Sequence, residues 1–288
     1  MTELANLLEQ NLTILIIVAS LFGLVAGSFL NVVIHRLPIM MEQSWRAECE
    51  ALNNIQNTDA RSPKKYNLIT PRSACPHCKK EISAWQNIPI LSFLLLGGKC
   101  KQCKTAISWQ YPGVEMISAL LVGLVTWKFG YSLNTLAASI FALSLLTLTF
   151  IDLNTQLLPD DITLPLLWLG LLFNLNTGFT DINSAVIGAV AGYLILWSVY
   201  WLFKLITGKE GMGYGDFKML AAIGAWFGWT MIPAVILLSS IAGSIIGISL
   251  MIFAKREKNT AIPFGPYLAL AGIAALFLGS QLSQLYLS

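Results

Sequence analysis

Long apolar runs make up most of the chain, and short polar stretches separate them. A helix that crosses the hydrocarbon core of a bilayer needs roughly 20 mostly apolar residues. Two runs, 162–176 and 218–231, are short for a span. The segments predicted to be transmembrane helices are 12–33, 112–130, 134–151, 162–176, 183–206, 218–231, 233–254 and 264–286. The pattern therefore predicts an all-α polytopic membrane protein with about eight transmembrane helices.

One polar region of any size, 34–111, interrupts this pattern. Its first part, 42–70, has mixed charge and no apolar period, so we expect a loop or short helices there and assign it no role. Its second part, 71–111, is too small to build a good hydrophobic core and needs another form of stabilisation. We expect a first transmembrane helix within 1–33, a cytoplasmic loop domain at 34–111 and a membrane domain of about seven helices at 112–288.

The composition agrees with a membrane protein. Hydrophobic residues make up 56% of the chain and charged residues 11%, and the mean hydropathy is +0.67. A soluble domain must cover its surface with polar groups and cannot usually hide so much apolar area. The first run, 12–33, does not read as a removable signal peptide, because its flank carries Glu3 and Glu9 instead of basic residues.

The distribution of basic residues predicts the orientation. The region 34–111 holds 11 of the 18 Lys and Arg residues against 5 acidic residues. Basic loops stay on the cytoplasmic side of the inner membrane, so the amino terminus is expected outside. Alternation along the predicted spans then brings further loops to the cytoplasm, at 152–161, 207–217 and 255–263.

Four cysteines form two CxxC pairs within 71–111. Cys75 and Cys78 are followed after 21 residues by Cys100 and Cys103. This spacing predicts a tetrahedral zinc site that is structural, because four thiolates leave no open coordination position. His77 lies inside the first pair and is expected not to bind the metal. Disulfides are the alternative, disfavoured in the reducing cytoplasm, and redox chemistry would need a different fold around the pair.

Two acids are placed at membrane depth, where ionisable groups are costly and usually functional. Asp152 directly follows the predicted span 134–151, and Asp216 lies just before the span 218–231. The predicted topology brings both acids to the same face although they are 64 residues apart. Two neighbouring carboxylates share one proton, so that one activates a water and the other protonates the scissile carbonyl. We therefore expect an aspartic peptidase dyad.

Residues around Asp216 are expected to support it. Gly213 and Gly215 allow a positive φ or a close approach of backbone to substrate. Lys218 is expected to neutralise or orient Asp216, or to reach toward the membrane interface. The alternatives are that Asp152 is an ordinary interfacial acid and that Asp216 caps its helix. A zinc-binding scaffold protein and a transporter are the competing functions; the transporter is disfavoured because both acids lie at one face.

With these motifs the chain resembles a known family, the bacterial type IV prepilin peptidases, over about residues 20–270. Five motifs agree with that family in order and spacing. They are Gly27–Pro38, the paired CxxC motifs, Trp109–Glu115, Asp152 with Leu158–Asp160, and Gly213–Lys218.

The resemblance implies a bifunctional membrane enzyme. Asp152 and Asp216 would remove the basic leader of prepilins or pseudopilins after a glycine, at the cytoplasmic face. The same enzyme would then methylate the new amino terminus, commonly Phe, with S-adenosylmethionine, and the cytoplasmic cysteine-bearing part is associated with that step. The implied partners are these substrates and inner-membrane lipids, with no nucleic acid, in pilus assembly or type II secretion.

The residues themselves do not lead to a methyl-donor site. No G-x-G follows a predicted strand in 34–111, and the region is too small for a dinucleotide-binding domain. His35, Arg36 and Glu115 are candidates for a cofactor pocket or for its scaffold. The alternative is a His-Arg pair that sets topology and a buried helix acid. The individual substrates and the oligomeric state stay open.

Overall fold

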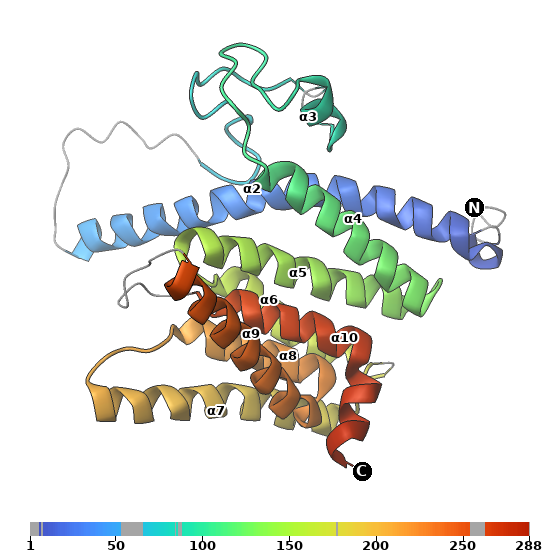
Figure 1. Cartoon of the computed structure of the whole chain (residues 1–288), viewed down its shortest axis with the longest axis vertical. Coiled ribbons are helices and arrows are strands. Elements are labelled where there is room, and N and C mark those ends of the chain that lie inside the picture. The colour runs from blue at the N-terminus through green and yellow to red at the C-terminus, as the bar shows by residue number, and fades with distance from the viewer. Residues whose placement is uncertain are drawn as a thin grey trace. The chain divides into compact units, whose positions relative to one another are not determined.

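The computed structural model describes residues 6, 8–52, 66–83, 85, 88–176, 178–253 and 263–287. The described chain is mostly helical and falls into two compact units, Met1–Thr135 and Leu136–Ser288 (Figure 1). Most of the predicted cytoplasmic loop 255–263 lies outside the described residues, as do residues 53–65.

Each of the predicted spans is a helix. They are α2 (Leu12–Leu52), α4 (Gln110–Phe129), α5 (Leu133–Thr155), α6 (Asp160–Phe173), α7 (Ile182–Thr207), α8 (Tyr214–Phe227), α9 (Ile232–Phe253) and α10 (Gly265–Leu287). Within the described residues, five helical segments are long and apolar enough to cross a membrane. The α6 and α8 helices have 14 residues each, or about 21 Å, which is less than the roughly 30 Å of a bilayer core. The all-α membrane class is confirmed, and within the described residues five of the eight predicted spans have the length and hydropathy of a transmembrane helix.

The α2 helix is much longer than a span. Its 41 residues extend for about 60 Å, twice the thickness of a bilayer core. The expectation of a loop or short helices is wrong for 42–52, which continue the helix. Side chains one turn apart pair along this polar end, in an ion pair between Glu42 and Arg46 and a hydrogen bond between Ser44 and Glu48. Such i,i+4 pairs stabilise a helix that has no apolar period.

In the first unit, α2 and α4 pack at close range. A Cβ added to Gly27 would lie 2.7 Å from the Cα of Glu115, and one added to Gly23 would lie 2.8 Å from the carbonyl oxygen of Ser118. Small residues at such a spacing let two membrane helices approach through their backbones. The start of α4 is therefore placed firmly against the middle of α2.

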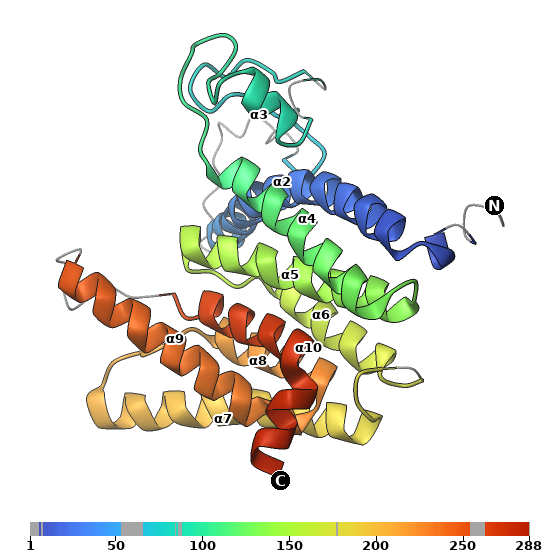
Figure 2. The same cartoon turned by 45° about the vertical axis from the view of Figure 1, so that its right-hand side comes forward.

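In the second unit, α8 lies among α6, α7 and α10 (Figures 1 and 2). Its residues from Asp216 to Phe227 are nearly all buried, as expected of a helix that is apolar on every side. Trp226 of α8 contacts Phe141 of α5, and its indole N–H donates to the carbonyl of Leu166 in α6 at 2.8 Å. Because neighbouring helices surround α8, its short length exposes little backbone to lipid.

Candidate functional site

Asp152 lies in the last turn of α5 and is buried. Its Oδ2 accepts a hydrogen bond of 3.0 Å from the amide of Gly265, the first residue of α10. A Cβ added to Gly265 would lie 2.6 Å from that oxygen, so the contact depends on glycine. Gly265 was not among the residues expected in the site. A Gly-Pro pair before an apolar run marks a helix start, but it does not indicate which side chain the amide meets.

Asp216 lies in the first turn of α8 and is also buried. Its Oδ2 accepts a hydrogen bond of 3.2 Å from the amide of Gly213, so the carboxylate does cap the helix. The other oxygen, Oδ1, is buried and makes no hydrogen bond within the described part of the chain. A buried polar atom without a partner is rare in a folded protein. Capping therefore accounts for only one of the two oxygens.

Leu158, between α5 and α6, connects the surroundings of the two acids. A Cβ added to Gly215 would lie 2.6 Å from the Cβ of Leu158, and one added to Gly265 would lie 3.2 Å from its Cδ2. The glycine before Asp216 and the glycine bonded to Asp152 thus both contact one side chain. The two carboxylates are close enough to interact electrostatically. The tertiary structure brings Asp152 and Asp216 together from the ends of different helices.

Gly213 and Gly215, the glycines on either side of Tyr214, do not adopt a positive φ. Gly213 has a φ of −85° and precedes α8, and Gly215 lies in its first turn. A Cβ on Gly213 would meet nothing closer than 3.9 Å, whereas Gly215 lies directly against Leu158. The close approach at Gly215 is therefore the structural reason for glycine in this segment.

Lys218 pairs with Asp160. Its Nζ lies 2.7 Å from each carboxylate oxygen of Asp160, in the first turn of α6. Both side chains are partly exposed. The lysine thereby links α8 to α6 two residues after Asp216, and Asp160 takes part in this ion pair in addition to its place at the start of α6.

The cysteines lie in two turns of the same geometry. The amide of Cys75 donates to the carbonyl of Lys80 at 2.9 Å, and the amide of Cys100 donates to that of Thr105 at 2.8 Å. Lys79 and Lys104, at equivalent positions, each have a φ of 59°. Each turn is thus stabilised by its own backbone bonds and presents two thiols on one side.

The four thiols of Cys75, Cys78, Cys100 and Cys103 can hold a metal ion. Their sulfur atoms lie within 4.8 Å of one another, and the Sγ atoms of Cys75 and Cys103 are 3.8 Å apart. A disulfide would bring two sulfurs to about 2.05 Å. A tetrahedral ion with metal–sulfur bonds of about 2.3 Å places its ligands about 3.8 Å apart. Hydrogen bonds with Thr105 lower the pKa of Cys103 to about 6, which favours its thiolate. Against a backbone hydrogen bond with Lys80, burial and the neighbouring thiols raise the pKa of Cys78 to about 11.

Arg36 and Glu115 hold the cysteine-bearing segment to the first unit's helices. The buried Arg36 of α2 donates from Nη1 to the carbonyl of Asn67 at 2.9 Å, before the first turn. The buried Glu115 of α4 accepts from the amide of Ile90 at 2.8 Å, between the two turns. Ile90 has a φ of 57°, unusual for a β-branched residue. His35 is exposed.

Arg36 and Glu115 thus each make a hydrogen bond with the backbone of the cysteine-bearing segment, and the Glu115 carboxylate also interacts with the side chain of Ser28. Of the roles expected for these residues, such contacts favour that of a scaffold.

Comparison with known proteins relates both units to one enzyme family. A model of the bacterial peptidase A24 N-terminal domain matches residues 21–129, and a model of the type IV leader peptidase family matches residues 139–248. The boundary between the compact units, after Thr135, falls in the interval between these matches.

Relatives similar to the chain over nearly its whole length include prepilin leader peptidase/N-methyltransferases. The one from Aeromonas salmonicida strain A449 is 54% identical over 93% of this chain and 92% of its own. The one from Pseudomonas aeruginosa is 53% identical over 93% and 91%, and the one from Stutzerimonas stutzeri is 50% identical over 97% and 96%. No solved structure gives a significant match.

Proposed function

Because the chain belongs to the type IV leader peptidase family, we propose that Asp152 and Asp216 are the dyad with which it cleaves prepilins. Family membership makes the chain a prepilin-processing peptidase and N-methyltransferase of the inner membrane, and sets aside the scaffold and transporter alternatives. The assignment of individual residues, the orientation and the cofactors are our proposals.

The observation that carries the dyad is the buried Oδ1 of Asp216, which has no hydrogen-bond partner in the described part of the chain, on an acid that interacts electrostatically with Asp152. Two adjacent buried carboxylates cannot easily both ionise, so they hold one proton between them. The ionised acid accepts a proton from the attacking water, while the protonated acid donates to the scissile carbonyl. The amides of Gly265 and Gly213 bind one oxygen of each acid and leave the others for water and substrate.

The glycines and Lys218 support this dyad through the backbone. Gly215 lets α8 approach Leu158, and Gly213 supplies the amide that orients Asp216. Lys218 positions the same helix through Asp160. These contacts support positioning roles for the three residues.

We propose that the substrate is a prepilin or pseudopilin whose basic leader hangs into the cytoplasm and is removed after a glycine. Such a substrate would serve pilus assembly or type II secretion. The excess of Lys and Arg in 34–111 supports a cytoplasmic position for that region, with the amino terminus outside. A peptide in a helix is hydrogen-bonded to itself, so the cleaved bond must lie just outside the substrate's membrane helix.

We propose zinc as the metal of the cysteine site. Four thiolates in a tetrahedron suit zinc and leave no open position, so the ion would be structural and would take no part in cleavage. The separation of 3.8 Å between two of the sulfurs supports this assignment. Zinc bound there would stabilise a segment too small to fold around a hydrophobic core.

We also propose that methylation belongs to the amino-terminal part with the loop domain at 34–111, and cleavage to the membrane part at 112–288. S-adenosylmethionine would supply the methyl group. In this proposal Arg36 and Glu115 hold the cysteine-bearing segment in place, and the donor binds at other residues.

The dyad is tested with Asp152→Asn and Asp216→Asn in the full-length protein reconstituted in proteoliposomes with a prepilin. Each variant should insert normally and lose leader cleavage by about three orders of magnitude or more, because an amide cannot hold or exchange the shared proton. Asp161→Asn, an exposed acid at the start of α6, is the matched control and should cleave at the wild-type rate. Substantial cleavage by either dyad variant would exclude this mechanism.

A further inference from the structure

The segment 208–213 connects α7 to α8 and sets where Asp216 lies. It contains three glycines, Gly208, Gly211 and Gly213, so its sequence restrains the backbone very little. Gly208 ends α7 in the left-handed region with a φ of 70°. Asp216 follows three residues after the segment, in the first turn of α8. Contacts outside the backbone must therefore hold this connection.

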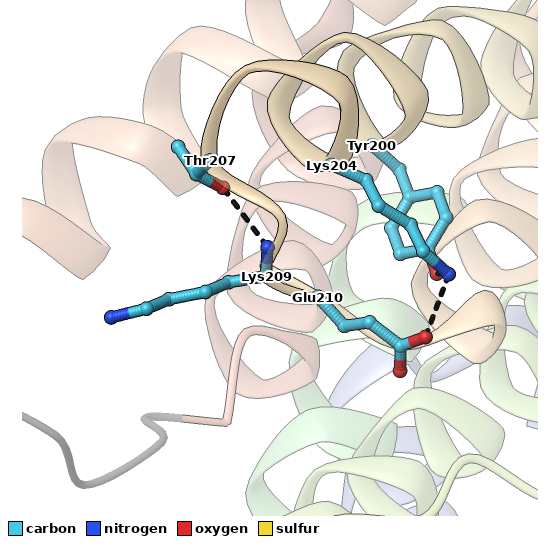
Figure 3. Close-up of polar contacts among 5 residues, drawn as sticks. All are labelled: Tyr200, Lys204, Thr207, Lys209 and Glu210. Carbon is cyan, nitrogen blue, oxygen red and sulfur yellow. Dashed lines mark hydrogen bonds and ion pairs between the residues drawn. The ribbon is translucent and has the colours of Figure 1, made fainter.

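A polar network at the end of α7 makes such contacts (Figure 3). The Nζ of Lys204 donates to Oε1 of Glu210 at 2.8 Å and to the hydroxyl of Tyr200 at 3.2 Å. The hydrogen bond from Lys204 lowers the pKa of Glu210, so its carboxylate is charged at neutral pH. The middle of the glycine-rich segment is thus bonded to the last turns of α7.

The same network reaches the first turn of α8. The ring of Tyr200, which is 2% exposed, lies 5.3 Å from the ring of Tyr214 and 5.7 Å from that of Phe217. Tyr214 and Phe217 flank Asp216 in the sequence. Lys204 and Tyr200 therefore connect Glu210 to the turn of helix that carries the acid.

We infer that the Lys204–Glu210 ion pair positions Asp216 for catalysis by holding the 208–213 segment against the end of α7. The inference rests on the proposed role of Asp216. Neither residue touches the reacting atoms; both act through the position of the α8 amino terminus. Together with Lys218–Asp160 on α6, the pair holds the beginning of α8 from a second helix.

Because the Lys204–Glu210 pair is accessible to solvent, its effect on the position of Asp216 can be measured apart from its effect on folding stability. The side chains of Lys204 and Glu210 are 34% and 70% exposed. Ion pairs this accessible contribute little to global folding, so the melting temperature of a variant should stay within about 3 °C of wild type. A loss of activity with a preserved fold then reports the geometry of the segment.

The neighbouring Lys209 provides a matched control. Its side chain points away from Glu210 (Figure 3), and its amide donates to Oγ1 of Thr207 at 3.2 Å. It has the same charge as Lys204 and lies in the same connection. Lys209→Gln therefore removes a charge without removing the pair.

The test measures kcat and KM for leader cleavage by the full-length protein in proteoliposomes. Lys204→Met and Glu210→Gln should each lower kcat about five-fold, with KM changed by less than about two-fold. Lys209→Gln should behave as wild type. The reversed pair, Lys204→Glu with Glu210→Lys, should recover most of the lost kcat, because the hydroxyl of Tyr200 can donate to a carboxylate at position 204.

The outcomes separate this inference from the proposed dyad. Wild-type kcat in both single variants, failure of the reversed pair to recover activity, or an equal loss in Lys209→Gln would each overturn the positioning role. Asp216→Asn is measured in parallel. If it stays inactive while Glu210→Gln is unaffected, the dyad stands and the ion pair has no catalytic role. If Asp216→Asn cleaves, the dyad fails and the positioning inference fails with it.

Discussion

The backbone amide of Gly265 donates a hydrogen bond to Oδ2 of Asp152, which precedes it by 113 residues. The bond joins the first residue of α10 to the last turn of α5. Free amides at a helix amino terminus favour negative charge, so this contact stabilises the ionised form of Asp152. Besides the carboxylates of Asp152 and Asp216, the site thus includes a backbone group, the amide of Gly265.

Gly265→Ala is expected to impair cleavage. The added methyl group would lie 2.6 Å from Oδ2 of Asp152 and force the acid or α10 to move. A displacement of this size in a catalytic group lowers kcat by roughly 10- to 100-fold. Leader cleavage in proteoliposomes measures the effect.

Gly279→Ala, in the same helix, is the control for that substitution. Among the described residues, its added methyl group would meet the Sδ of Met231 at 3.9 Å, which is an ordinary contact. Its activity should equal that of wild type. Equal activity of Gly265→Ala and Gly279→Ala would show that the amide of Gly265 does not need to lie so close to Asp152.

Loss of a cysteine should remove the metal. Purified wild-type protein is expected to contain about one zinc ion per chain, and Cys100→Ser to contain much less, because three thiolates bind a structural ion more weakly than four. The cysteine-bearing segment should then become sensitive to protease. Elemental analysis and limited proteolysis measure both effects.

His77→Ala distinguishes four-cysteine ligation from a mixed site. Four sulfurs already lie within 4.8 Å of one another, so the variant should keep its zinc. A metal content in His77→Ala as low as in Cys100→Ser would mean that the imidazole is a ligand. An intramolecular disulfide in the purified wild-type protein would contradict the metal site.

Glu115→Ala is expected to loosen the segment between the two cysteine turns. The substitution leaves the amide of Ile90 without its acceptor, at a local cost of about 1–3 kcal/mol. Hydrogen exchange at residues 88–95 should accelerate, and methylation should fall more than cleavage. Glu48→Ala, on the exposed end of α2, is the control. Unchanged exchange in Glu115→Ala would remove the basis for a scaffold role.

Replacing the residue before the cleavage point of a prepilin tests where the substrate backbone lies in the site. Replacing the glycine before the cleavage point of a prepilin with leucine should stop processing, because the backbone must approach the crowded turn at Gly215 and Leu158. An alanine at the same place should be tolerated better than leucine. Unchanged processing of the leucine substrate, or cleavage at the outer face of the membrane, would show that substrate enters differently.

Several features followed from the sequence because their causes are local. The apolar runs predicted a helix at each expected span, since burial in lipid requires a continuous apolar segment that satisfies its own backbone. The spacing of Cys75, Cys78, Cys100 and Cys103 predicted a metal site, since each CxxC turn forms within six residues through its own hydrogen bonds. Motif order was enough to identify the family.

Other features depended on contacts between distant segments. Lys218 was expected beside Asp216, but Asp160 of α6, 58 residues away, accepts its hydrogen bonds. The contacts of Arg36 with the carbonyl of Asn67 and of Glu115 with the amide of Ile90 could not be read from the sequence. The Gly-Pro pair at 265–266 marks a helix start in the sequence, but nothing there indicates that the amide of Gly265 meets Asp152. Sequence patterns reflect the preference of a residue for water, for lipid or for a helix. Only the tertiary structure determines which remote backbone group lies within about 3 Å of a given carboxylate, as the amide of Gly265 does at Asp152.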